Sequence, residues 1–199
     1  MDDKIISERI IELKNADLKL RNKLIEDKKL FEGYDEEMEK LHKQNAIILN
    51  EIINTIGYPT IDKVGKEASE AAWLIIQHSI GSPDFMKRCA EQLQNAVKEN
   101  QADPINLAYL TDRIATLEGK PQLYGTQFDW DEKGNLSPNL FDDLQMVNQR
   151  RQSIGLNSLE EQTELIRNRI IQENQLPPED FEKRKQEVLE WRRKTGWIK

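Results

Sequence analysis

The sequence contains one cysteine, two histidines and no long apolar run. Because Cys89 is the single thiol, neither an internal disulfide nor a cluster of metal-bound thiolates is available, and we expect a reducing, cytoplasmic location. No stretch of about 18 apolar residues occurs. The acidic, amphipathic start MDDKIISERI also differs from a secretion signal. Neither membrane spanning nor export is therefore expected.

Glycine, proline and aromatic residues are also scarce, with 9 Gly, 7 Pro and 7% aromatics, whereas 33% of the residues are charged. This composition favours a helical protein with a charged surface over a β-sandwich or barrel. The predicted fold is mainly α, an irregular multi-helix bundle. Its expected parts are an N-terminal amphipathic helix over 1–33, a helical core domain over 34–156 and a C-terminal helical extension over 157–199.

The net charge of −7 is unevenly distributed. Residues 1–33 carry 8 basic and 8 acidic side chains, and residues 178–199 carry 7 and 5, so the acidic excess lies between them. An acidic core repels phosphate backbones at long range, which disfavours nucleic acid as a partner. We expect instead a small polar or anionic ligand, and self-association through the terminal helices is a further possibility.

Hydrophobic spacing predicts a series of helices punctuated by glycine and proline. They are expected over residues 4–30, 35–56, 60–78, 84–99, 103–119, 143–154, 158–174 and 179–195. The helix over 60–78 is apolar nearly all round, which is typical of a central helix. Residues 120–141 have a different pattern and predict an irregular loop with one short β-hairpin.

Several standard catalytic patterns are missing. The sequence has no HExxH, Walker phosphate loop, GxGxxG, GxSxG or paired CxxC. Cys89 occupies a core position and is interpreted as an inert hydrophobe. The two histidines together with Asp112 do not have a spacing diagnostic of a metal site, so we predict neither a metal nor another cofactor.

Both histidines fall on helix positions that are expected to face the interior. A buried imidazole is either a satisfied core group or an acid, base or ligand. His78 ends the most apolar helix next to Gln77, and His42 shares a helix face with Asn45. We therefore predict His42 and His78 as catalytic candidates, and Asn45 and Gln77 as substrate-binding candidates.

A second group of polar residues surrounds the flexible Gly125. Such amide, phenol and hydroxyl groups can orient a polar ligand, although an ordinary β-turn explains them equally well. The predicted catalytic residue in this group is Asp112, and the predicted substrate-binding residues are Arg113, Gln122, Tyr124, Thr126 and Gln127.

Arg150 and Arg151 are further candidates for binding an anion. The alternative for this pair is an ion pair with Asp142, Asp143 or Glu160.

An ordered string of residues also resembles the bacterial domain-of-unknown-function 6624 family over roughly residues 38–160. The string is His42-x-x-Asn45, Gly57-Tyr-Pro-Thr60, Val64-Gly65, Ala71-Ala-Trp-Leu74, Gln77-His78, Tyr109-Leu-Thr-Asp-Arg113, Gly119-Lys-Pro-Gln122, Tyr124-Gly-Thr-Gln127 and Arg150-Arg151. The resemblance implies that polar family positions are matched by His42, His78, Asp112, Arg113, Gln122, Tyr124, Thr126, Gln127 and Arg151. It implies no established activity.

Two functional hypotheses follow. In the first, the protein is a hydrolase or group transferase, in which His78 or His42 is the general acid or base and Arg113 or Arg151 holds an anionic group of a small polar or phosphorylated substrate. In the second, the same residues form a noncatalytic ligand-binding or protein-interaction site of the sensor or immunity type. The enzyme hypothesis requires both imidazoles to line the same hollow as the bend at 124–126.

Overall fold

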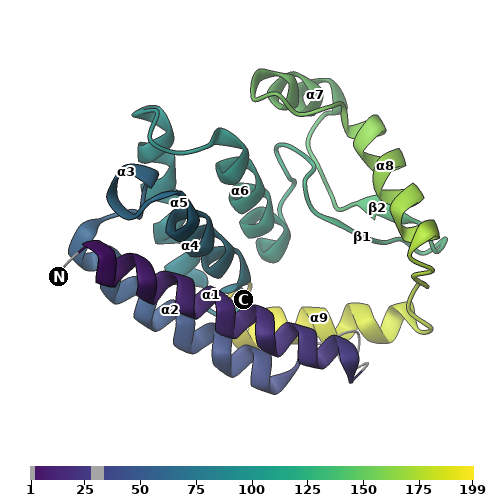
Figure 1. Cartoon of the computed structure of the whole chain (residues 1–199). Helices are drawn as coiled ribbons and strands as arrows, with labels where there is room; N and C mark the ends of the chain where they lie inside the picture. Colours follow the sequence, from purple (N-terminus) through teal and green to yellow (C-terminus); the bar gives the residue numbers. More distant parts are fainter. Residues whose placement is uncertain (1–2, 28–33) are drawn as a thin grey trace. The chain divides into compact units, whose positions relative to one another are not determined.

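The computed structural model of the chain describes residues 3–27 and 34–199. Within these residues it contains nine helices and one two-stranded antiparallel hairpin, so the fold is mainly α, as predicted. The chain divides into two compact units, residues 1–103 and residues 104–199 (Figure 1). None of the helices in the described part of the chain is both long enough and apolar enough to cross a membrane.

The regular structure of the first unit, in the residues described, is helical. Its helices are α1 (Asp3–Glu26), α2 (Glu36–Ile56), α3 (Ile61–Val64), α4 (Lys66–His78) and α5 (Pro83–Lys98). Helix α4 packs against the other four, which agrees with the central position expected from its apolar sequence. Its small buried residues Ala68, Ala71 and Ala72 allow this close packing.

One predicted helix is divided in two. The sequence pattern favoured a single helix over residues 60–78, but Gly65 separates α3 from α4. Gly65 has φ 78° and ψ 163°. This backbone region is open essentially to glycine alone, and it lies outside helical geometry. The chain therefore changes direction at Gly65 before the buried helix begins.

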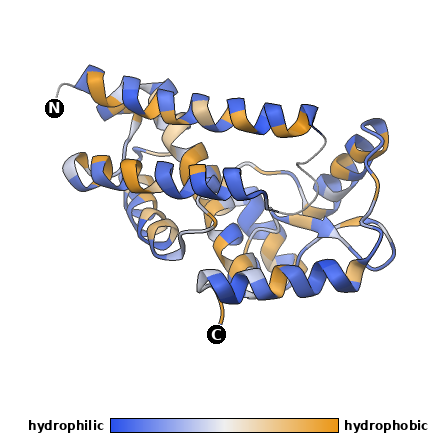
Figure 2. Cartoon of the chain, turned by 90° about the horizontal axis from the view of Figure 1, so that it is seen from below, coloured by the Kyte–Doolittle hydropathy of each residue, from blue (hydrophilic) through white to orange (hydrophobic). Residues whose placement is uncertain are grey.

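Helix α1 buries one face along its length. Hydrophobic residues recur turn after turn between hydrophilic ones (Figure 2), and those on the inner face are Ile6, Ile10, Leu13 and Leu24. Asp17 lies on the same face and is 1% exposed. The predicted continuation of this helix to residue 30 and its interruption over 31–33 fall largely on residues 28–33, outside the described residues.

Helix α2 begins at a side-chain cap. The carboxylate of Asp35 accepts hydrogen bonds from the backbone N–H groups of Glu37 and Met38, which satisfies donors that a helix start leaves open. The helix ends at Ile56, as the sequence predicted, and is followed by Gly57, whose φ is 75°. The buried face of α2 includes His42 and Asn45.

The second unit combines four helices with the hairpin. Its elements are α6 (Pro104–Glu118), β1 (Phe128–Trp130), β2 (Leu136–Pro138), α7 (Leu144–Ser153), α8 (Leu159–Gln172) and α9 (Phe181–Thr195). In the hairpin, Phe128 pairs with Pro138 and Trp130 with Leu136. The predicted capping box at the start of α8 is present, between Ser158 and Glu161.

Candidate functional site

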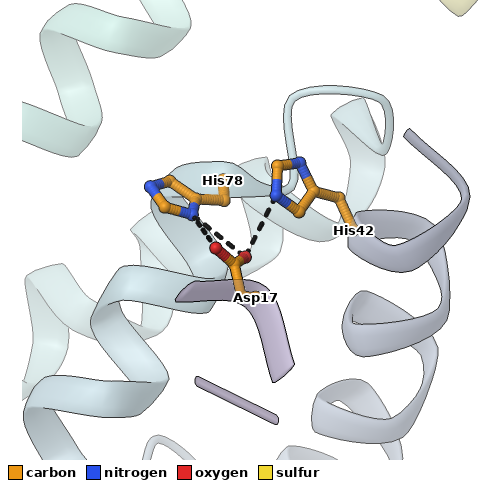
Figure 3. Close-up of side chains that lie close together, drawn as sticks. All are labelled: Asp17, His42 and His78. Carbon is orange, nitrogen blue, oxygen red and sulfur yellow. Dashed lines mark hydrogen bonds and ion pairs between the residues drawn. The ribbon is translucent and has the colours of Figure 1, made fainter. Parts of the chain in front are cut away.

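Three polar side chains from three helices of the first unit converge beneath its surface. Asp17 comes from the middle of α1, His42 from the second turn of α2, and His78 is the last residue of α4 (Figure 3). Their side chains are 1%, 9% and 26% exposed, respectively. The structure thus brings the two predicted histidines together, around a carboxylate that the sequence analysis did not select.

The Asp17 carboxylate lies between the two imidazole rings. Nδ1 of His78 is 3.0 Å from each of its oxygens, and Nε2 of His42 is 3.0 Å from Oδ2. The ring centroids of His42 and His78 are 5.2 Å apart. One carboxylate oxygen and one nitrogen from each ring all lie within 4.8 Å of one another.

The contact between His42 and Asp17 is not a well-formed hydrogen bond. Nε2 of His42 is buried and has no hydrogen-bond partner in the described part of the chain, although Oδ2 of Asp17 is only 3.0 Å away. The two atoms are close enough for an ion pair, but their geometry falls short of a hydrogen bond. A buried imidazole nitrogen that lacks a hydrogen bond is energetically costly unless another group satisfies it.

The electrostatics of the cluster favour an ionised carboxylate. Burial opposes ionisation of Asp17, but the adjacent imidazoles of His42 and His78 outweigh burial and lower the pKa of this carboxyl well below its usual range. A buried anion is thus fixed between two nitrogen groups, which is an arrangement suited to holding a cation.

Tyr34 fixes the other side of the His42 ring. Its hydroxyl oxygen is 2.7 Å from Nδ1 of His42. Burial, with help from the charges of Glu39 and Asp17, raises the pKa of the Tyr34 phenol, so the hydroxyl keeps its proton. The phenol can donate to Nδ1 or accept from it. In the second case the proton is on Nδ1, and Nε2 is left with a lone pair for a ligand.

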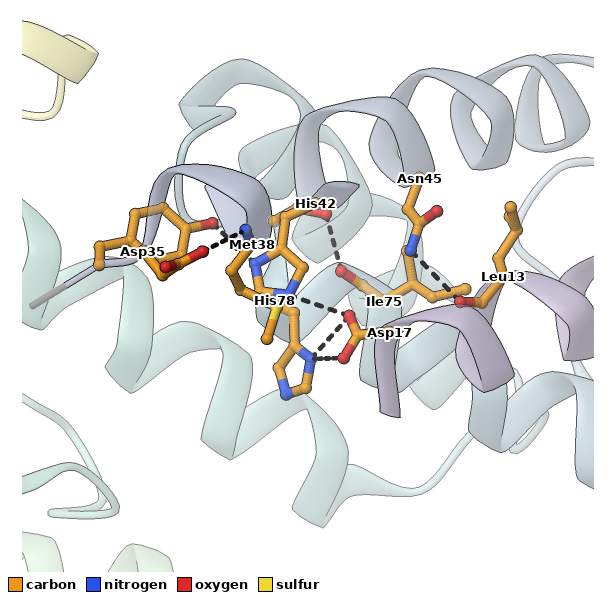
Figure 4. Close-up of polar contacts among 10 residues, drawn as sticks. Leu13, Asp17, Asp35, Met38, His42, Asn45, Ile75 and His78 are labelled. Carbon is orange, nitrogen blue, oxygen red and sulfur yellow. Dashed lines mark hydrogen bonds and ion pairs between the residues drawn. The ribbon is translucent and has the colours of Figure 1, made fainter. Parts of the chain in front are cut away.

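Hydrogen bonds from side chains to backbone carbonyls link the helices around Asp17, His42 and His78. Asn45, on α2, donates from Nδ2 to the Leu13 carbonyl of α1 at 3.3 Å (Figure 4). Ser7 of α1 donates to the Val64 carbonyl at 2.8 Å. Gln77 is buried directly before His78. Asn45, predicted as a substrate-binding residue, thus links two helices that carry the cluster.

A pocket of about 180 Å³ opens over the three side chains. It is lined by Asp17, Arg21, Tyr34, Asp35, Met38, His42 and His78. Larger hollows of about 910 and 490 Å³ lie in the second unit, but no histidine or cysteine is among their lining residues. Of these three hollows, the small one in the first unit is lined by the two histidines and Asp17.

In the second unit, the predicted catalytic residue Asp112 organises the segment after α6. Its buried carboxylate accepts hydrogen bonds from the backbone N–H groups of Leu123, Tyr124 and Thr126, at 2.8 to 3.2 Å. Burial raises the pKa of Asp112, and these backbone donors oppose that effect. Asp112 thus holds the bend around Gly125 in place.

Gln122, Arg113 and Gln127 extend this network. The Gln122 amide donates to the carbonyls of Gln127 and Asn139 and accepts from the Gln127 backbone N–H at 2.7 Å. The Gln127 side chain accepts from Nε of Arg113 at 3.1 Å and donates to the Thr126 hydroxyl at 3.0 Å. The predicted residues of this loop therefore lie together and bond mainly to one another.

The two predicted arginines of α7 also have protein partners. Arg151 is 1% exposed and donates to the Tyr124 carbonyl and to the backbone and side-chain oxygens of Asn157. Arg150 forms an ion pair with Asp142 at 2.8 Å, which was one of the alternatives considered from the sequence. Burial lowers the pKa of the Arg151 guanidinium.

The predicted site residues thus form two groups. His42, His78, Asn45 and Gln77 belong to the first unit, and those from Asp112 to Arg151 belong to the second. That both groups line one hollow stays a prediction. Sequence reasoning missed Asp17, Tyr34 and Arg21.

A signal for Asp17 was present in the sequence. It occupies a position of the apolar stripe of α1, between Leu13 and Leu24, where a solvated acid is out of place.

Comparison with known proteins gives a family but no activity. No curated protein and no solved structure matches the chain. A family model does match residues 6–171, which include most of α1 with Asp17, both histidines and the Asp112 network. This match covers most of the 199 residues, so the chain belongs to the family of unknown function DUF6624.

Proposed function

We propose that this protein is a metal-dependent hydrolase, in which Asp17, His42 and His78 bind one divalent transition-metal ion of the zinc class. The observation that carries the proposal is the convergence of Nε2 of His42, Nδ1 of His78 and a carboxylate oxygen of Asp17 within 4.8 Å, with Nε2 of His42 buried and without a hydrogen bond. An ion between these atoms would satisfy Nε2 and neutralise the buried carboxylate.

The type of donors supports a catalytic site. Two imidazole nitrogens and one carboxylate oxygen are a common protein ligand set for catalytic zinc, whereas structural zinc sites close all four positions with protein ligands. Three donors leave one position for water, and His78 borders the pocket from which a substrate would approach. Tyr34, on Nδ1 of His42, supplies the outer hydrogen bond that orients such ligands.

The proposed chemistry is hydrolysis of a small polar compound. A divalent ion lowers the pKa of bound water to about 7, so that a hydroxide is available near neutral pH. The oxygen of this hydroxide would bond to the electrophilic carbon or phosphorus atom of the substrate. The bond to the leaving group would break, and the leaving group would take up a proton from solvent or from the water.

A second candidate function is metal-free acid–base catalysis by His78. It is supported by the two 3.0 Å contacts of Nδ1 with Asp17, which would orient the ring in the manner of a catalytic histidine–aspartate pair. Nε2 lies on the far side of the ring from Asp17 (Figure 3). Transferase activity or noncatalytic recognition of the same ligand would use this pocket as well.

The direct test is an isothermal calorimetric titration of the metal-free full chain with zinc. We expect one ion per chain. The variants Asp17→Asn, His42→Gln and His78→Gln should each weaken zinc binding by about 100-fold or more, since even outer-shell changes cost about 10- to 100-fold. Asp62→Asn, an exposed acid of α3, is the matched control and should bind zinc normally.

Circular dichroism of each variant separates loss of ligation from loss of folding. Cobalt in place of zinc adds a spectroscopic readout, because its visible absorption reports the coordination geometry. Absence of saturable zinc and cobalt binding to the folded wild-type chain would refute the metal proposal. Turnover that survives a chelator but is lost in His78→Gln would instead establish the acid–base function.

A further inference from the structure

Arg21 is a cationic group that lines the pocket but is not one of the three proposed metal ligands. It lies one helical turn after Asp17 on α1, and it lines the same pocket as Asp17, His42 and His78. The residue is exposed. Within residues 3–27 and 34–199 its guanidinium has neither an ion-pair nor a hydrogen-bond partner, unlike Arg150 and the buried Arg151.

In the described part of the chain, the carboxylates near Arg21 each have another partner. Asp35 lines the pocket, and its Oδ1 accepts the N–H groups that begin α2. Glu39 pairs with Lys43 on the same helix. Asp17 faces the two imidazoles. Among the described residues that line the pocket, Arg21 is therefore the cationic group, and its five N–H donors have no partner in the described part of the chain.

We infer that the substrate carries an oxyanion, a phosphoryl or carboxylate group, that binds between Arg21 and the open position of the metal ion. The ion in this arrangement rests on the proposed function, whereas Arg21 is an independent observation. A planar guanidinium binds two oxygens of one anion, and a divalent ion would polarise a third oxygen or the bond to be cleaved.

The charges of the pocket agree with this inference. With a divalent ion bound, two neutral imidazoles and the carboxylates of Asp17 and Asp35, the added charge of Arg21 gives a net positive pocket. The positive electrostatic potential of such a site attracts a small anion. An uncharged substrate would leave the guanidinium without a partner in the complex.

The size of the pocket limits what it encloses. The pocket of about 180 Å³ is the smallest of the three described hollows. This space accommodates one phosphoryl or carboxylate group and the bond next to it. A nucleotide or a peptide would extend beyond the pocket, so recognition there is directed at the anionic group.

Binding of inorganic phosphate and of acetate to the full chain tests the inference. Zinc content is measured first, excess zinc is removed, and each anion is then titrated calorimetrically against wild type, Arg21→Gln and Arg21→Lys. The control is Arg9→Gln, on the same helix but outside the pocket, where Arg9 pairs with Glu12.

We expect Arg21→Gln to weaken anion binding by about 10- to 100-fold, the value of hydrogen bonds to a charged group. The anion affinity of Arg21→Lys should lie between those of Arg21→Gln and wild type, because lysine keeps the positive charge but lacks the planar pair of N–H donors. Arg9→Gln should bind as wild type does. The comparison of phosphate with acetate tells which oxyanion the site prefers.

The outcomes separate the two proposals. If every variant binds zinc but Arg21→Gln binds both anions as tightly as wild type, or wild type binds neither, the oxyanion inference is overturned and the metal centre stands. If the chain binds no zinc, the proposed function fails. Anion binding that is then lost in Arg21→Gln would still support the role of Arg21.

Discussion

Replacement of Asp112 by alanine should destabilise the second unit without affecting zinc binding. The Asp112 carboxylate is buried and receives the backbone N–H groups of Leu123, Tyr124 and Thr126. Each orphaned donor costs about 1 kcal/mol or more. The loss would total about 3 kcal/mol, less what is regained because a buried carboxylate no longer has to be desolvated. We therefore expect a net loss of about 2 kcal/mol in the free energy of unfolding.

The assay is urea unfolding followed by tryptophan fluorescence and circular dichroism. Three of the four tryptophans, Trp130, Trp191 and Trp197, belong to the second unit, so fluorescence reports mainly on it. Asp112→Asn keeps the shape and one acceptor oxygen, and it should lose about half as much.

A loss below about 0.5 kcal/mol in Asp112→Ala would refute the structural role that the hydrogen bonds indicate. An isostere that folds normally but abolishes activity would return Asp112 to the catalytic role predicted from the sequence.

Three further predictions concern single side chains. Tyr34→Phe removes the hydroxyl 2.7 Å from His42 and should weaken zinc binding about 10-fold with little change in stability; an unchanged Kd would show that the phenol does not orient the ring. Gly125→Ala should lower the free energy of unfolding in urea by about 1–3 kcal/mol, because φ is 63° and the added Cβ would lie 2.7 Å from Leu159 Cδ1. In a double-mutant cycle, the Leu159→Ala background should remove only the steric part of that cost. Cys89 is 2% exposed and burial raises its pKa to about 12, so the folded chain should resist iodoacetamide at mildly alkaline pH and react once denatured. Rapid labelling of the folded state would contradict this placement of the thiol.

The helices could be predicted from the sequence because their determinants are local. The periodicity of α2, the proline that begins α6 and the capping box of α8 act within a few residues, and all three predictions are confirmed. The break at Gly65 was missed, because a glycine beside small apolar residues also fits a closely packed helix. Only its positive φ distinguishes the two cases.

The candidate site was predictable in part, because its residues are far apart in the sequence. His42 and His78 were selected for lying on apolar helix faces, and they do lie together. The carboxylate between them could not be assigned from spacing, since nothing local relates position 17 to positions 42 and 78. Asp112, which was considered as the third metal donor, instead accepts backbone hydrogen bonds in the second unit.

Because the three proposed metal donors come from α1, α2 and α4, metal binding would link the occupancy of the site to the attachment of the N-terminal helix. An ion that binds the folded but not the unfolded chain adds about 2.7 kcal/mol when its free concentration is a hundred times Kd. In this protein that energy would stabilise the packing of α1 against the other helices of its unit. Zinc depletion should therefore make α1 the first segment open to proteases. A chain trimmed before α2 would keep both histidines yet lose the ion.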